Sequence, residues 1–167
     1  MILGLSLSAF TTLHVILSLI GILAGVVVVV GMLAAKPLPG WTAVFLASTV
    51  LTSVTGFLFP FSALLPSHVV GIISLVVLTI AVLALYLFRL QGIWRWVYIL
   101  GAVLALYFNA FVAVVQAFQK LPFLQPLSPT QSEPPFVVAQ LAVLILFLGL
   151  AVMALRSFHP AAPAATS

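Results

Sequence analysis

The chain has 167 residues, of which 65% are hydrophobic and only 4% are charged. Soluble domains carry charge on about 25% of their residues, so this composition excludes a soluble globule and indicates a protein embedded in lipid. The formal charge of +4 comes from five single basic residues at the ends of apolar segments, which excludes nucleic-acid binding, and the lack of cysteine excludes thiolate catalysis and iron–sulfur clusters.

Apolar runs of about 20 residues are long enough for a helix to cross roughly 30 Å of hydrocarbon. Five such runs predict an all-α fold, a polytopic membrane protein whose single domain, residues 1–156, is a bundle of five transmembrane helices. The first run lacks a preceding basic region and is too long for a signal peptide, so we expect a retained helix. The expected spans are about 8–34, 42–60, 68–88, 94–118 and 136–155.

Prolines mark the connections between these runs. Pro37 and Pro39 end the first span, Pro60 and Pro66 bend the chain before the third, and Pro134 with Pro135 opens the fifth. Residues 119–135 form the one long polar interval, a predicted outer loop stiffened by five prolines. We expect residues 157–167 to form a disordered cytoplasmic tail.

The basic residues choose the orientation, because cytoplasmic loops are enriched in Lys and Arg. With the N-terminus outside and the C-terminus inside, only Lys120 faces outward. Four basic residues then face the cytoplasm, namely Lys36, Arg89, Arg95 and Arg156. The same orientation brings all three tryptophans, Trp41, Trp94 and Trp96, to the inner interface, where an aromatic belt is expected.

Nearly all intramembrane polar residues then fall in the outer half of the bundle. The spacing of Thr11, His14, Ser18, Gly21 and Gly25 draws one polar and small stripe along the first helix. Small residues of this kind also serve simply as packing surfaces between membrane helices. We expect a polar pocket beneath the outer loop, with Glu133, the sole acidic residue, above it. The candidate residues are His14, Ser18, Thr52, Thr55, His68, Asn109, Gln116, Glu133 and Gln140.

An apolar pocket with a few hydrogen-bonding groups suits a lipophilic small molecule such as a quinone, an isoprenoid or a lipid. A second hypothesis is an accessory subunit of a membrane complex, associated with another protein or with further copies of the chain. An enzyme is not favoured, and no catalytic residue is assigned, because one Glu without Asp or Cys supports neither a carboxylate pair nor the usual triads.

Two histidines at similar depth leave cofactor binding open. His14 and His68 are the candidate axial ligands of a single b-type haem in an electron-transfer protein. The same two histidines, joined by Glu133, also have ligand types suited to zinc or another divalent ion, although no close motif spacing links them.

Several short segments resemble those of small multi-spanning bacterial inner-membrane proteins without an assigned activity. The segments are Thr52–Phe57 with Phe59-Pro60-Phe61, Trp94-Arg95-Trp96, and Pro129–Phe136, and the resemblance spans Thr12 to about Leu150. It implies the bacterial cytoplasmic membrane as the location and supplies no activity.

Overall fold

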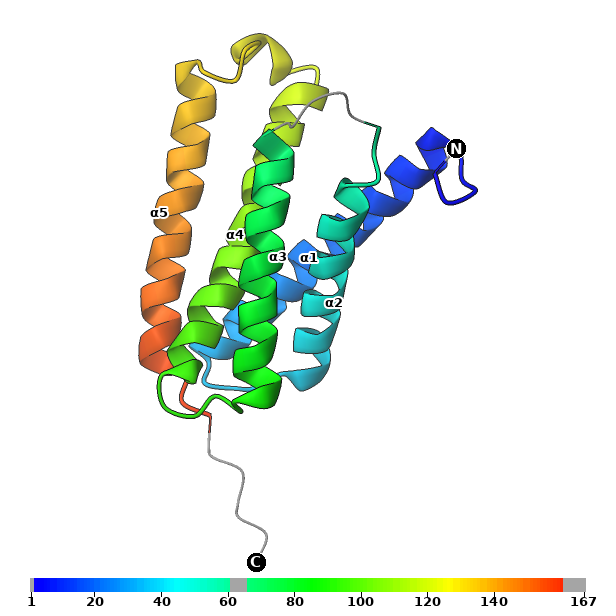
Figure 1. Cartoon of the computed structure of the whole chain (residues 1–167). Helices are drawn as coiled ribbons and strands as arrows, with labels where there is room; N and C mark the ends of the chain where they lie inside the picture. The colour runs from blue at the N-terminus through cyan, green and yellow to red at the C-terminus, as the bar shows by residue number, and fades with distance from the viewer. Residues whose placement is uncertain (1, 61–65, 161–167) are drawn as a thin grey trace, which may run out of the picture.

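The computed structural model describes residues 2–60 and 66–160 and is helical throughout, apart from one isolated β-bridge between Ile2 and Leu5. Five α-helices run alternately in opposite directions, so that the first and last helices begin at the same end of the bundle (Figure 1). A π-helical turn η1 continues α3, and a 3-10 turn η2 lies between α4 and α5. The elements are α1 Leu7–Leu33, α2 Pro39–Gly56, α3 Pro66–Val82, η1 Leu83–Leu87, α4 Trp94–Lys120, η2 Gln125–Leu127 and α5 Pro134–Ser157.

Four segments are long and apolar enough to span a membrane: Leu7–Leu33, His68–Leu87, Trp94–Lys120 and Pro134–Ser157. The remaining helix, α2, has 18 residues, which cover about 27 Å at 1.5 Å per residue and fall short of the roughly 30 Å of hydrocarbon. It is also rich in Ser and Thr. The predicted bundle of five helices is therefore present, and four of them are long and apolar enough to span a membrane.

Two predicted spans end differently from expectation. The second span was expected at 42–60, but α2 ends at Gly56 because the N–H groups of Phe57 and Leu58 turn back to carbonyls three residues earlier. The third span ends in the wider turn η1, where the N–H of Phe88 donates to the carbonyl of Leu83 at 2.9 Å. The spacing of hydrophobic residues predicts neither the early end of α2 nor the π-helical turn η1.

The expected disordered tail, 157–167, is wrong for its first residues. Ser157 belongs to α5, and Phe158 is buried against Tyr98, with ring centroids 6.4 Å apart. The Arg95 guanidinium donates to the carbonyls of Leu155 at 3.2 Å and Phe158 at 2.7 Å, which caps the end of α5. Residues 161–167 lie outside the described residues.

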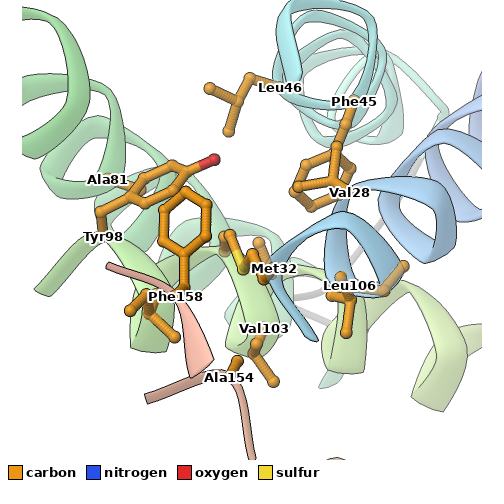
Figure 2. Close-up of a cluster of buried hydrophobic side chains, with 14 of the residues drawn as sticks. Val28, Met32, Phe45, Leu46, Ala81, Tyr98, Val103, Leu106, Ala154 and Phe158 are labelled. Atoms are coloured by element: carbon orange, nitrogen blue, oxygen red, sulfur yellow. The ribbon is translucent and has the colours of Figure 1, made fainter. Parts of the chain in front are cut away.

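The apolar core lies toward the end of the bundle where α1 ends and α4 begins. Figure 2 shows Val28 and Met32 of α1, Phe45 of α2, Tyr98 of α4 and Phe158, which follows α5, converging there. The close approach depends on glycine, as the stripe on the first span predicts. A Cβ on Gly25 would lie 2.6 Å from Leu106 Cδ1 and 2.8 Å from Phe45 Cε2, so only glycine lets α1 lie this close to α2 and α4.

Four of the five basic residues gather at the end of the bundle that holds this core. Lys36 follows α1, Arg89 follows η1, Arg95 opens α4 and Arg156 lies in the last turn of α5. Lys120 lies in the last turn of α4, at the opposite end, beside the loop that leads to α5 (Figure 1). The two ends of the bundle thus differ in charge.

Candidate functional site

A cavity lies between α1, α2, α3 and α4, in the half of the bundle that contains the α4–α5 loop. It consists of two neighbouring hollows of about 490 and 120 Å³. Both hollows are lined by His14, Ser18, Gly56, His68 and Val112. These shared residues make the two hollows parts of one site, which we call the four-helix cavity.

Six of the nine candidate residues line this cavity: His14, Ser18, Thr52, His68, Asn109 and Gln116. Their convergence follows from depth and helical phase, since all six lie in the same half of the bundle and on faces turned toward neighbouring helices. A seventh candidate, Thr55, does not line the cavity but contacts the His14 side chain.

His14 is fixed by contacts from α2 and from the segment that follows it. Its Nδ1 lies 2.8 Å from Thr55 Oγ1, and its ring meets the Phe59 ring edge-on at a centroid distance of 5.2 Å. Phe59 is itself packed against Phe10 at 5.1 Å. The imidazole therefore has a defined orientation, and its Nε2 has no hydrogen-bond partner among the described residues.

Two further polar contacts tie the cavity walls together. Asn109 Nδ2 donates to Thr49 Oγ1 at 3.2 Å, joining α4 to α2, and both side chains are buried. Ser53 Oγ donates to Ser74 Oγ at 3.3 Å, joining α2 to α3. Sequence reasoning missed both serines, although a hydroxyl in an otherwise apolar span was a signal that could have identified Ser74.

His68 is buried near the start of α3 and lines both hollows together with His14. Its ring is tilted by 39° against the Phe57 ring, with centroids 5.7 Å apart. Phe57 also lines the smaller hollow. His68 of α3 and His14 of α1 thus line the same cavity.

Glu133 is not among the residues that line the cavity; of the predicted outer loop, 119–135, Lys120 is the one described residue that lines it. Its carboxylate accepts hydrogen bonds from the hydroxyls of Ser128 at 2.6 Å and Thr130 at 2.8 Å, and from the N–H groups of Thr130 and Ser132. The Ser128 hydroxyl is the largest of the influences that lower the pKa of Glu133 to about 2. Hydroxyl-bearing neighbours satisfy the carboxylate locally, so the loop folds on itself, and none of residues 121–133 lines the cavity.

Gln140 is also absent from the cavity. Its Nε2 donates to the carbonyl of Phe111 at 3.2 Å, which joins α5 to α4 on the far side of α4 from the cavity. Its Oε1 is buried and is the one such side-chain atom in the described part of the chain without a hydrogen bond. Gln140 therefore joins two helices instead of lining the cavity.

These placements decide between the metal hypotheses. The described residues contain no group of three or more His, Asp or Glu side chains that could hold a metal ion. The site built from His14, His68 and Glu133 is therefore wrong, because the carboxylate is engaged in its own loop. The pairing of His14 with His68 in one cavity leaves haem ligation as a hypothesis.

A separate hollow of about 230 Å³ lies at the opposite end of the bundle, beside the core of Figure 2. It is lined mainly by apolar side chains, with Lys36, Tyr86 and Tyr98 among its polar residues. No sequence pattern predicted it.

Comparison with protein-family models finds no matching family, and searches among curated proteins and solved structures also return no significant match. The function of the four-helix cavity is therefore argued from its own residues.

Proposed function

We propose that this protein binds a lipophilic small molecule, such as a quinone, an isoprenoid or a lipid, in the four-helix cavity. The observation that carries this proposal is the meeting of His14, Ser18, His68 and Asn109 in one hollow whose remaining walls are mostly apolar. Such sites orient a ligand by a few hydrogen bonds and hold the rest of it by apolar contact.

The larger hollow has a wall that reaches the outside of the bundle. Val15 and Leu19 line it, yet 42% and 53% of their side-chain surface is exposed on the outer face of α1. In a membrane this face meets acyl chains. An apolar ligand can thus enter from the bilayer without crossing a polar barrier, which supports a lipophilic rather than a water-soluble ligand.

Gly56 provides a direct test of the proposal. It lines both hollows, and a Cβ at this position would meet only His14 Cε1, at an ordinary contact distance of 3.8 Å. Gly56→Leu should therefore fill the cavity without a backbone clash. Gly149→Leu is the matched control, because nothing lies within 4 Å of a Cβ there.

The experiment is solvent extraction of the purified proteins followed by mass spectrometry. We expect one lipophilic species to be retained by the parent and by Gly149→Leu at near-stoichiometric amounts, and lost from Gly56→Leu. A mixture reflecting the bulk membrane lipids, equal in all three proteins, would refute the proposal.

We further propose that all five helices cross the bacterial cytoplasmic membrane, with the N-terminus outside. The concentration of Lys36, Arg89, Arg95 and Arg156 at one end of the bundle supports this orientation. The resemblance of several segments to bacterial inner-membrane proteins supports the location. A topology reporter joined after the last residue should report the cytoplasm, and a periplasmic signal would refute the orientation.

A single b-type haem is the second candidate function, favoured by the presence of His14 and His68 in one cavity. His14 Nδ1 is held by Thr55, while its Nε2 has no hydrogen-bond partner in the described part of the chain, the arrangement usual for a ligating imidazole. An absorption spectrum decides: a Soret band lost in His14→Ala and in His68→Ala would establish haem, and a colourless protein with haem supplied during expression would exclude it.

A further inference from the structure

His14 lines both hollows. The hydrogen bond between its Nδ1 and Thr55 decides whether its Nε2 donates or accepts a hydrogen bond. Thr55 Oγ1 lies 2.8 Å from His14 Nδ1, and it also lies 2.7 Å from the Leu51 carbonyl and 3.1 Å from the Thr52 carbonyl. A hydroxyl has one proton but two lone pairs, so it can donate in only one of these directions.

Threonine side chains within helices donate to the carbonyl four residues earlier. The 2.7 Å contact to Leu51 is the shortest that Thr55 makes, and Thr11, Thr52 and Thr79 show the same i−4 pattern in this protein. With its proton directed to Leu51, the Thr55 oxygen accepts from His14. The neutral imidazole then carries its proton on Nδ1, which leaves a lone pair on Nε2.

The surrounding charges favour this neutral form. No carboxylate lines the cavity in the described part of the chain, and the rim carries the ammonium group of Lys120. The sole acidic residue, Glu133, is held in its own loop. Among the described residues, the cavity therefore offers no carboxylate to pair with an imidazolium or with a cationic ligand.

Two threonine hydroxyls that line the cavity also offer lone pairs rather than protons. Thr52 donates to the Ser48 carbonyl at 2.9 Å, and Thr11 donates to the Leu7 carbonyl at 2.8 Å. Ser18 remains able to donate or accept, and Gln116 with Lys120 lies farther out at the rim. Thr52 and Thr11 thus offer a ligand acceptor lone pairs, as Thr55 offers them to His14.

We infer that the ligand of the four-helix cavity is an apolar alcohol whose hydroxyl donates a hydrogen bond to His14 Nε2. This inference rests on the proposed function and specifies its ligand class. The apolar body of the ligand lies against Val15, Leu19, Ile22, Phe59 and Val112. Ethers and ketones of the same size can only accept a hydrogen bond, so His14 discriminates against them.

The test compares probes that differ only in the hydroxyl proton. Equilibrium binding of farnesol and of farnesyl methyl ether is measured with the full chain in detergent micelles. We expect the alcohol to bind about tenfold more tightly, the value of one hydrogen bond to a partly buried acceptor. In Thr55→Val the imidazole can move its proton to Nε2, so the preference should fall toward one. Thr79→Val, which removes a similar hydroxyl from an exposed face of α3, should keep the full preference.

The outcomes separate the two proposals. Equal or tighter binding of the ether by the parent, with both probes lost in Gly56→Leu, would overturn the alcohol inference and leave the cavity as a binding site. Binding of neither probe, or equal binding in Gly56→Leu, would overturn both. If Thr55→Val fails to fold, the nitrogen-15 NMR spectrum of the parent still decides, because protonation of His14 on Nε2 instead of Nδ1 would overturn the inference.

Discussion

His14 Nδ1 lies 2.8 Å from Thr55 Oγ1, and this contact joins α1 to α2 across 41 residues of sequence. It fixes the orientation of the one imidazole that both hollows share. Because the hydroxyl is already within 2.7 Å of its own helix carbonyl, we infer that His14 carries its proton on Nδ1. The first prediction concerns this bond.

Replacing Thr55 with Val keeps the shape of the side chain and removes the acceptor. We expect the free energy of unfolding in detergent to fall by about 1 kcal/mol, the usual value of one polar contact between membrane helices. The nitrogen-15 spectrum of labelled histidine should show His14 protonated on Nδ1 in the parent and a mixture of tautomers in the variant. Thr79→Val serves as control and should leave both measurements unchanged, whereas an unchanged His14 spectrum in Thr55→Val would contradict the assigned bond.

The packing of α1 makes a second prediction. A methyl group on Gly25 would meet Leu106 and Phe45 at 2.6 to 2.9 Å, so Gly25→Ala should destabilise the protein by about 1–3 kcal/mol through overpacking. Gly149→Ala adds the same methyl group where nothing lies within 4 Å and should be neutral or slightly stabilising. Denaturant titration of both variants is the measurement, and equal stabilities would show that α1 does not approach its neighbours this closely.

The contact between Asn109 and Thr49 can be measured by a double-mutant cycle. Both side chains are buried and are joined at 3.2 Å, so Asn109→Ala and Thr49→Val should each destabilise the fold. Their coupling free energy should be about 0.6 kcal/mol, and no more than about 1.7, as found for hydrogen bonds between membrane helices. Additive effects of the two changes would mean that the bond does not contribute.

Glu133 makes a prediction about pH. Its pKa is lowered to about 2, chiefly by the Ser128 hydroxyl, so the ionised carboxylate favours the folded loop. A lowered pKa in the folded state means that this stabilisation is complete above the ordinary value of 4.5 and is lost as the pH falls toward 2. The carboxylate carbon shift in a labelled protein reports the titration directly. Ser128→Ala should raise the midpoint toward 4.5, and a midpoint near 4.5 in the parent would contradict the hydrogen-bonded loop.

Much of this site could be predicted because polar residues are rare in apolar helices and are therefore easy to identify in the sequence. Depth followed from span position and facing from the spacing of residues such as His14, Ser18 and Gly25, so six cavity residues and the close approach of α1 were found. Two further candidates, Glu133 and Gln140, have other neighbours than the cavity residues. Periodicity does not tell whether a carboxylate bonds within its own loop, or that α5 packs on the side of α4 away from the cavity.

The most direct test of ligand binding is photochemical mapping with a long-chain alcohol that carries a diazirine in its tail. We expect labelling to concentrate on cavity residues such as Ile22, Phe59 and Val112, and to disappear in Gly56→Leu while persisting in Gly149→Leu. Labels spread along the exposed face of α5, at residues such as Ile145 and Leu148, and unchanged in Gly56→Leu would show that the probe meets the protein only as bulk lipid does.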